Sequence, residues 1–251
     1  MVDHSFADLS LAALYDSLNP WGPGDDFYLG LVQGARSVLD VGCGTGQLLR
    51  RARAEGHSGR LMGLDPAAAM LVQARRARPD VEWVLGDLRV RRWDGEFDLV
   101  VMTGHAFQVL VEDDELRASL RTVRSALAPG GRFVFETRNP AVRAWETWTP
   151  DRVREVVAPD RAVVRVRHEV AAPPAGDRDR APERVTFTET FTSEAWERDR
   201  VSSTTLRFLD AKALGHLLAE AGLTVVAQYG DWGREPLSPT APEIITVAAR
   251  H

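Results

Sequence analysis

The sequence predicts an α/β fold in which a mixed sheet is covered by helices. An apolar run at 38–41 leads into closely spaced glycines and then into a helical segment at 47–52, which is the order strand, tight turn and helix N-terminus. Asp40 lies near the end of this run, and two further apolar runs end at Asp65 and Asp87. Ligands of open α/β sheets bind beyond the carboxyl ends of the strands, so the three acids are expected to share one ligand site.

The glycine turn after the first strand is expected to approach a nucleotide-like ligand closely. Gly42, Gly44 and Gly46 alternate there, and a Cβ at such positions would keep the ligand away from the backbone. The free N–H groups that open the next helix would then face the ligand. Cys43 is the single cysteine of the chain, and we interpret it as a small side chain that fits the turn rather than as a catalytic thiol.

The stretch from Asp40 to Gly46, Asp-Val-Gly-Cys-Gly-Thr-Gly, resembles the first motif of class I S-adenosylmethionine (SAM) dependent methyltransferases. The dinucleotide fingerprint GxGxxG needs a third glycine at position 47, where this chain has Gln47. Leu-x-Pro-Gly-Gly at 127–131, followed by an apolar strand at 132–137, also resembles this family, specifically its small-molecule, methyltransferase domain 25-like members. The alternatives are an NAD(P) or FAD fold with a degenerate fingerprint, or a glycine turn that binds nothing.

Further elements are predicted by hydrophobic periodicity and by helix caps. Helices are expected over 10–18, 46–54, 66–71, 113–127 and 211–221, the last capped by Asp210, and core strands over 60–65, 81–88, 96–102, 132–137, 224–229 and 243–249. The resemblance implies a Rossmann-like sheet of seven strands in the order 3-2-1-4-5-7-6, with helices on both faces. Alternating residues at 162–170, 184–191 and 201–209 predict an antiparallel insertion after the fifth strand.

The cofactor implied by the resemblance is SAM, with S-adenosylhomocysteine as its product. Asp65 follows about 20 residues beyond the glycines, where a carboxylate can accept hydrogen bonds from both ribose hydroxyls. The resemblance also places Tyr15 over the methionine end, Met70 against the adenine, and Asp87 and Leu88 at the adenine edge. Tyr15 packing on the sheet and Met70 packing in the core are the open alternatives. The complete expected set is Tyr15, Asp40, Gly42, Cys43, Gly44, Gly46, Asp65, Pro66, Met70, Gly86, Asp87, Leu88, Thr103 and Gly104.

His105 follows the fourth strand, where the sulfonium and the methyl acceptor should meet. It is the histidine that the pattern places there, and a group with a near-neutral pKa suits a general base or an orienting residue. The alternative is that 103–105 lines the cofactor through backbone atoms while His105 only shapes the pocket.

The antiparallel insertion resembles the substrate cover of small-molecule methyltransferases. Its neighbourhood supplies the candidates for acceptor binding, which are Arg138, Trp145, Trp148, His168 and Trp232. Trp232 has an alternative role as the anchor of a proline-rich loop. The polar loop at 173–180 alternates arginines with aspartates, which favours a solvated hairpin tip over a binding patch.

The chain is expected to contain four parts. Residues 1–34 form a leading segment over the cofactor, 35–138 the SAM-binding core, 139–209 the substrate-covering insertion, and 210–251 the last helix and the last two core strands.

Composition and charge limit the kinds of partner that the chain is expected to bind. The chain has 251 residues, 44% of them hydrophobic, and a formal net charge of -5, with arginines interleaved among acids, so a nucleic-acid partner is not favoured. It shows neither a leader pattern nor an apolar run long enough for a membrane span. We therefore expect a cytoplasmic monomer or homodimer without a metal or membrane partner.

The predicted function is SAM-dependent methyl transfer to a nitrogen or oxygen of a small molecule by in-line displacement. One alternative is a SAM-binding regulator without transfer activity. Another is an RNA or protein methyltransferase that docks its substrate on the insertion. The acidic balance and the absence of an Asn-Pro-Pro-Tyr type motif after the fourth strand count against the macromolecular substrate.

Overall fold

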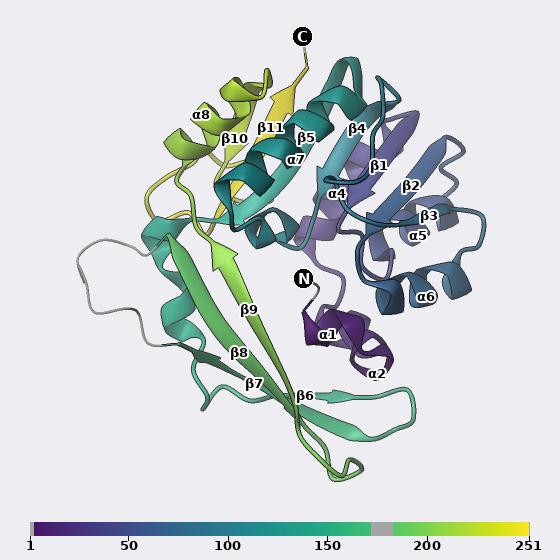
Figure 1. The fold of residues 1–251 in the computed structure, drawn as a ribbon, viewed down its shortest axis with the longest axis vertical. Coiled ribbons are helices and arrows are strands. Elements are labelled where there is room, and N and C mark those ends of the chain that lie inside the picture. The colour runs from purple at the N-terminus through teal and green to yellow at the C-terminus, as the bar shows by residue number, and fades with distance from the viewer. Residues whose placement is uncertain (1–2, 172–182, 251) are drawn as a thin grey trace.

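Two β-sheets organise the molecule. The computed structural model describes residues 3–171 and 183–250. A seven-stranded sheet has the order β10-β11-β5-β4-β1-β2-β3, and a separate four-stranded sheet has the order β6-β7-β8-β9. The large sheet and its helices form the upper body in Figure 1, and the small sheet hangs below it with the N-terminal helices between them.

The order of the large sheet confirms the predicted order of seven strands. Its strands are β1 (Ser37–Val41), β2 (Arg60–Asp65), β3 (Glu82–Leu85), β4 (Phe97–Met102), β5 (Leu127–Arg138), β10 (Thr224–Tyr229) and β11 (Glu243–Ala249). The first five pair in parallel, whereas β11 pairs antiparallel with both β5 and β10. The carboxyl ends of the parallel strands therefore meet at one edge of the sheet.

Helices cover both faces of this sheet. The helices α4 (Pro23–Gln33) and α5 (Gln47–Ala54) pack on one face, and α7 (Asp113–Ala126) and α8 (Ala211–Glu220) on the other. The helix α6 (Ala68–Ala77) lies beside α5. Within the described ranges, none of the helices has the length and apolar character that a membrane span requires.

The helix α4 was not predicted, because the proline and glycine residues at 20–24 indicated only a turn. Pro23 is instead the first helical residue, where its missing N–H costs nothing. The Asp25 carboxylate accepts a hydrogen bond from Gly22 N at 2.8 Å. This pairing fixes the entry of the chain into the helix.

The leading segment forms three short helices rather than the one helix predicted over 10–18. These are α1 (His4–Ala7), α2 (Leu9–Ala12) and α3 (Tyr15–Leu18). Leu11 and Leu14 pack against the small sheet, whereas Tyr15 packs towards α6. One straight helix would not present apolar residues to both partners, so the segment turns between them.

The small sheet has four strands, one more than the alternation predicted. They are β6 (Arg154–Val157), β7 (Val163–Val170), β8 (Arg184–Thr192) and β9 (Arg200–Arg207). The short β6 carries too little alternation to be recognised in the sequence. The predicted hairpin tip at 173–180 lies outside the described residues.

The contrast between Gly63 and Gly30 tests the packing of the core. A Cβ on Gly63 in β2 would lie 2.5 Å from the Trp83 ring and 2.7 Å from Cys43 Sγ, whereas nothing lies within 4 Å of a Cβ on Gly30. We expect Gly63→Ala to lower the free energy of unfolding by about 1–3 kcal/mol through overpacking. Gly30→Ala, at an exposed position inside α4, is expected to raise it by about 0.5–1 kcal/mol. Urea unfolding measures both, and equal effects would contradict the packing argument.

Candidate functional site

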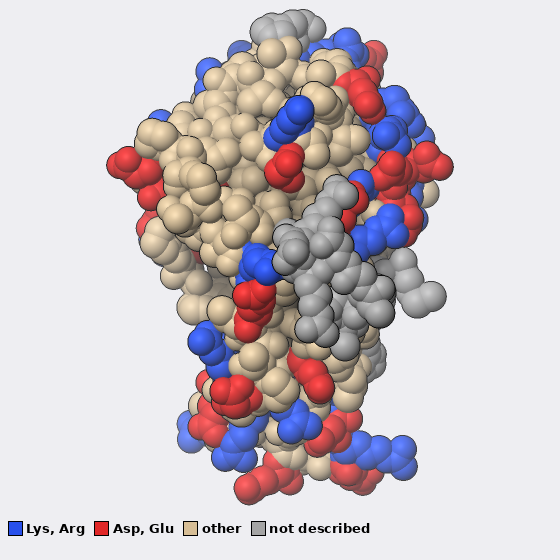
Figure 2. Space-filling view, turned by 90° about the vertical axis from the view of Figure 1, so that its left-hand side faces the viewer, with Lys and Arg blue, Asp and Glu red and all other residues tan. Residues whose placement is uncertain are grey.

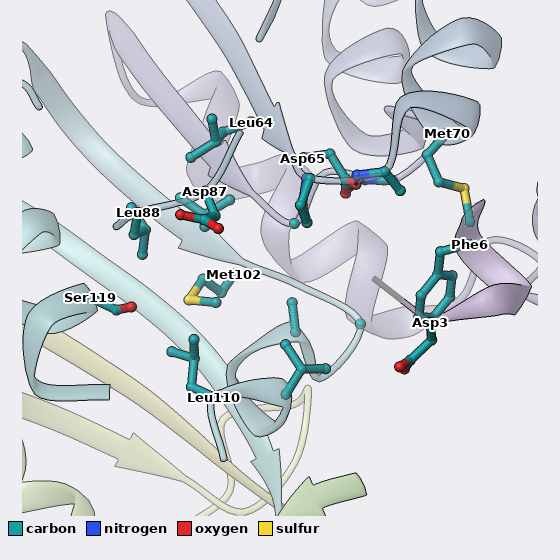
Figure 3. Close-up of a pocket in the computed structure, with 18 of the residues that line it drawn as sticks. Asp3, Phe6, Leu64, Asp65, Met70, Asp87, Leu88, Met102, Leu110 and Ser119 are labelled. Atoms are coloured by element: carbon teal, nitrogen blue, oxygen red, sulfur yellow. Dashed lines mark hydrogen bonds between the residues drawn. The ribbon is translucent and has the colours of Figure 1, made fainter. Parts of the chain in front are cut away.

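A cavity of about 600 Å³ opens at the carboxyl ends of the parallel strands. Figure 3 shows Asp65 and Asp87 at its wall, with Asp3 and Phe6 from the leading segment at its other side. Ser203 and Thr205 of β9 complete this side, so the insertion also contributes to the wall. The predicted residues that line the cavity are Tyr15, Gly42, Gly44, Asp65, Pro66, Met70, Gly86, Asp87, Leu88, Thr103 and Gly104. Asp40, Cys43 and Gly46 lie behind this lining.

The glycine turn is tied to the neighbouring strand by the Asp65 carboxylate. Its Oδ2 accepts a hydrogen bond from Gly44 N at 2.8 Å, and its Oδ1 accepts one from Ala67 N at 2.8 Å. Burial raises the pKa of Asp65, and the two backbone donors oppose this shift. Each carboxylate oxygen retains a lone pair for a further donor. Asp65 therefore both holds the turn and offers acceptors at the cavity wall.

Gly46 and Cys43 support the turn from behind. Gly46 has φ +76° and begins α5, and a Cβ there would overlap the Trp83 ring. Cys43 packs against Leu71, Ala74 and Trp83, and burial raises the pKa of its thiol. A protonated, enclosed thiol is a poor nucleophile, which agrees with the packing interpretation of Cys43.

Tyr15 covers the turn from the leading segment. The Tyr15 ring would lie 3.8 Å from a Cβ on Gly44, and its hydroxyl 3.7 Å from a Cβ on Gly104. Burial is the main cause that raises the pKa of Tyr15 to about 12, so its hydroxyl remains a neutral donor. The neighbouring Asp16 pairs with Thr45 Oγ1 at 2.5 Å and with Arg50 Nη1 at 3.0 Å. These contacts hold Tyr15 over the cavity.

The far part of the cavity is bordered by Met70, Asp87 and Leu88. Met70 is buried and clusters with Phe6 and Tyr15. Hydrogen bonds from Arg89 are the largest cause that holds the pKa of Asp87 below its usual range. Asp87 is therefore ionised at neutral pH and available as an acceptor.

Asp40 lies beneath the cavity as a buried acid without a full set of partners. Its side chain is 1% exposed, and Oδ1 has no hydrogen-bond partner. Burial, then the nearby carboxylates of Asp65 and Glu136, raise the pKa of Asp40 to about 8. An orphaned carboxyl oxygen in such a place indicates that a positive or donating group completes the site.

His105 is held by two glutamates that sequence reasoning missed. Its backbone has φ 61°, and its N–H donates to Glu136 Oε1 at 2.7 Å. Its ring Nε2 lies 3.0 Å from Glu243 Oε2. Tyr28 of α4 also donates its hydroxyl to Glu136. His105 is not among the residues that line the cavity, and its ring Nε2 faces Glu243 at the start of β11.

A signal for Glu136 was present in the sequence. It ends the apolar run of the fifth strand, as Asp65 and Asp87 end earlier runs. Glu243 had no such signal, because an acid that begins a strand has no fixed relation to a ligand. Only the antiparallel pairing of β11 with β5, which sets Glu243 opposite Arg138, brings it to this edge.

Three of the acceptor candidates, Arg138, Trp148 and His168, are connected through the Phe187 ring and the Trp148 ring itself. The Arg138 guanidinium lies 5.2 Å from the centroid of the Trp148 ring, and Trp148 packs edge-on against Phe187 at 5.0 Å. His168 is 5.8 Å from the same Phe187 ring, and its Nε2 is 3.0 Å from Glu189 Oε1. The core and the insertion therefore meet along this series of contacts.

The other two acceptor candidates pack elsewhere. Trp145 is buried and lies edge-on to Phe208 at 4.6 Å. Trp232 packs against Phe27 at 5.8 Å and Tyr28 at 6.0 Å, both on α4. Trp232 has the surroundings expected of a loop anchor. No three His, Cys, Asp or Glu side chains of the described ranges are grouped so as to hold a metal ion.

Comparison with known proteins gives matches over the glycine turn and the strands that follow. A methyltransferase domain model matches residues 38–131. The cypemycin N-terminal methyltransferase of Streptomyces sp is 39% identical over 109 residues, which cover 42% of this chain and 43% of that protein. The 2-phytyl-1,4-naphtoquinone methyltransferase of Thermosynechococcus vestitus is 32% identical over 163 residues, which cover 59% and 71%.

A third relative is an amino-sugar enzyme. The dTDP-4-amino-2,3,4,6-tetradeoxy-D-glucose N,N-dimethyltransferase of Saccharopolyspora spinosa is 34% identical over 143 residues, which cover 54% of this chain and 53% of that protein. The matches thus span about half the length of the first and third relatives.

Solved structures share the whole fold. SAM-bound CalS10 of Micromonospora echinaspora, an amino pentose methyltransferase, has a TM-score of 0.66 at 23% identity and covers 95% of this chain and 97% of its own. DesVI of Streptomyces venezuelae has a TM-score of 0.64 at 23% identity, with 100% of both chains covered. The fold, the glycine turn and the naphtoquinone relative agree, and the chain belongs to the class I SAM-dependent methyltransferases, a family of enzymes that use SAM as cofactor.

Proposed function

We propose that this enzyme transfers the methyl group of SAM to a nitrogen or oxygen atom of a small-molecule acceptor by in-line displacement. The cavity formed by the glycine turn and the acids at the ends of β1, β2 and β3 carries this proposal. Alignment of the reactants and exclusion of water are the main tasks of such a protein, because the donor is already activated.

The residues at the cavity fit SAM. Asp65 offers acceptors for the ribose, and Asp87 with Leu88 borders the space for adenine. Tyr15 covers the glycine turn at the methionine end. We propose that SAM is also contacted by Pro66, Met70, Gly86, Thr103 and Gly104. Cys43 and Gly46 are proposed to act indirectly, by supporting the glycine turn. Bound SAM supplies an electrophilic methyl group on a sulfonium.

The charge of the site also fits a cationic cofactor. Burial raises the pKa of both Asp40 and Glu136. A positive charge nearby would stabilise their ionised forms, and the same carboxylates would favour that charge in a site without bulk water.

His105 is proposed to take the proton of the acceptor. Its Nε2 pairs with Glu243, which leaves Nδ1 as the ring nitrogen for the acceptor. A hydroxyl acceptor needs such a base, whereas an amine that has lost its proton reacts without one. Glu243 sets the orientation of the ring in either case.

The acceptor is proposed to lie between the core and residues 139–209, with Arg138, Trp148 and His168 at its wall. Trp145 supports this wall from behind, and Trp232 fixes the loop over α4. Residues 1–34 would close the cofactor side, 35–138 bind SAM, and 210–251 complete the sheet. The names of two relatives describe methylation of amino groups, on a peptide N-terminus and on a nucleotide-linked sugar, and favour a nitrogen acceptor.

A macromolecular substrate has less support. On the face shown in Figure 2, acidic and basic side chains are intermixed over the insertion, without a stripe of one sign. Nucleic-acid surfaces concentrate positive charge. The remaining alternative is a SAM-binding regulator. A measurement of turnover distinguishes such a regulator from an enzyme that acts on a small molecule.

The first test is calorimetric titration with S-adenosylhomocysteine, and with NAD as the competing cofactor. We expect binding of the former only, weakened at least about tenfold in Asp65→Ala, because charge-assisted hydrogen bonds are lost. Asp98→Ala is the control, since Asp98 pairs with Arg36 near the start of β4, at the opposite edge of the sheet. Binding of NAD alone would refute the proposal.

Proton release tests the charge of the site. The pKa of Asp40 is about 8, so this group is protonated at pH 7. A bound cation lowers this pKa, and SAM binding is therefore expected to release a proton and to tighten as pH rises from 6 to 8. Calorimetry in buffers of different ionisation enthalpy counts the protons.

Two variants isolate Asp40 in this experiment. Asp40→Asn is expected to release fewer protons than the wild type. Asp87→Asn should leave the count unchanged, because the pKa of Asp87 is already low. If wild type and Asp40→Asn released the same number of protons, the pKa of Asp40 would not depend on the bound cofactor.

Turnover of His105 variants tests the base. With a hydroxyl acceptor, His105→Ala is expected to lower kcat by about 10²-fold or more, because the acceptor loses its general base. Glu243→Gln is expected to lower kcat less than His105→Ala does, because Glu243 only orients the ring. Full turnover of His105→Ala at every pH would exclude a base at this position.

A further inference from the structure

Arg138 differs from the other deeply placed arginine in its lack of an acidic partner. Arg207, whose side chain is 9% exposed, pairs with Asp113 at 2.7 Å and Glu183 at 2.6 Å. Arg138 is partly buried, and no carboxylate of the described residues lies within ion-pair distance of it. Its guanidinium instead lies over Trp148 and donates from Nη1 to Gln108 Oε1 at 3.0 Å.

The nearby acids are committed to other groups. Glu243 lies opposite Arg138 in the pairing of β5 with β11, but its carboxylate faces the His105 ring. Glu136 receives the His105 N–H and the Tyr28 hydroxyl. Burial lowers the pKa of Arg138, and the attraction of these two glutamates offsets only part of that shift. A desolvated cation is therefore left without a counter-charge at contact distance.

The donors of Arg138 are also free and accessible. A guanidinium has five N–H groups, and one of them is used by Gln108. Nε and Nη2 have no hydrogen-bond partner in the described ranges, and neither is among the fully buried atoms that lack one. Both therefore reach solvent while Trp148 covers the guanidinium face. This leaves the planar edge that binds carboxylate or phosphate through two parallel bonds.

We infer that Arg138, held flat by Trp148, binds an oxyanion of the methyl acceptor, so the acceptor is an anionic small molecule bearing a carboxylate or phosphate group. The inference rests on the proposed function. Arg138 lies two residues beyond Glu136, the partner of the His105 backbone, and two strand residues span about 7 Å.

Matched probes test this inference without knowledge of the acceptor. The full chain is titrated with phenylacetate, phenyl phosphate and the neutral phenylacetamide, with and without S-adenosylhomocysteine. We expect at least one anion to bind about tenfold or more tightly than the amide, because hydrogen bonds to charged groups exceed neutral ones. The two anions distinguish a carboxylate from a phosphate site.

Variants test whether Arg138 causes the preference for anions over the amide. Arg138→Met is expected to abolish this preference. Arg167→Met removes the same charge from the exposed face of β7 and should retain the preference. Arg138→Lys, which keeps the charge but not the planar edge, should retain part of it and decides the matter if Arg138→Met does not fold.

The outcomes separate this inference from the proposed function. Equal binding of amide and anions, no binding of either anion, or an unchanged preference in Arg138→Met or Arg138→Lys would overturn the anionic site. Loss of S-adenosylhomocysteine binding by the wild type would refute the proposed function instead. If that happens, the titrations with phenylacetate and phenyl phosphate in the absence of S-adenosylhomocysteine still test the anion site at Arg138.

Discussion

The Asp65 carboxylate is the interaction on which the site depends. It accepts backbone N–H groups from the glycine turn after β1 and from the residue that precedes α6. One side chain therefore fixes the relative positions of two strand ends and two connections. The cavity exists because these connections diverge around Asp65, and Gly44 permits the backbone to approach it.

Buried acids at the same edge make the site electrostatically incomplete. Burial raises the pKa of both Asp40 in β1 and Glu136 in β5, and the nearby Glu136 carboxylate adds to the shift of Asp40. Proteins seldom retain unpaired buried carboxyl groups unless a ligand or mechanism uses them. The cofactor of this family, SAM, carries a positive charge, which is the reason we propose that it binds at this edge.

The leading segment and the insertion close the site together. Thr204 Oγ1 of β9 donates to Asp3 Oδ2 at 2.6 Å, and Arg200 Nη1 lies 3.2 Å from Asp8 Oδ1. Asp16 ties the end of this segment to the glycine turn. The leading segment is thus connected by side-chain contacts both to the insertion and to the glycine turn.

The sequence by itself determined the α/β class and most of the residues that line the cavity at the strand ends, and the strand order of the core followed from its family resemblance. The class and the lining residues depend on local periodicity, glycine spacing and acids at strand ends, and all three act over short stretches of chain. The tertiary structure alone decided the pairing of His105 with Glu243, the placement of Arg138 on Trp148, and the separation of Trp232 from the other acceptor candidates. These contacts join residues far apart in sequence through antiparallel register and loop packing, which no local pattern encodes.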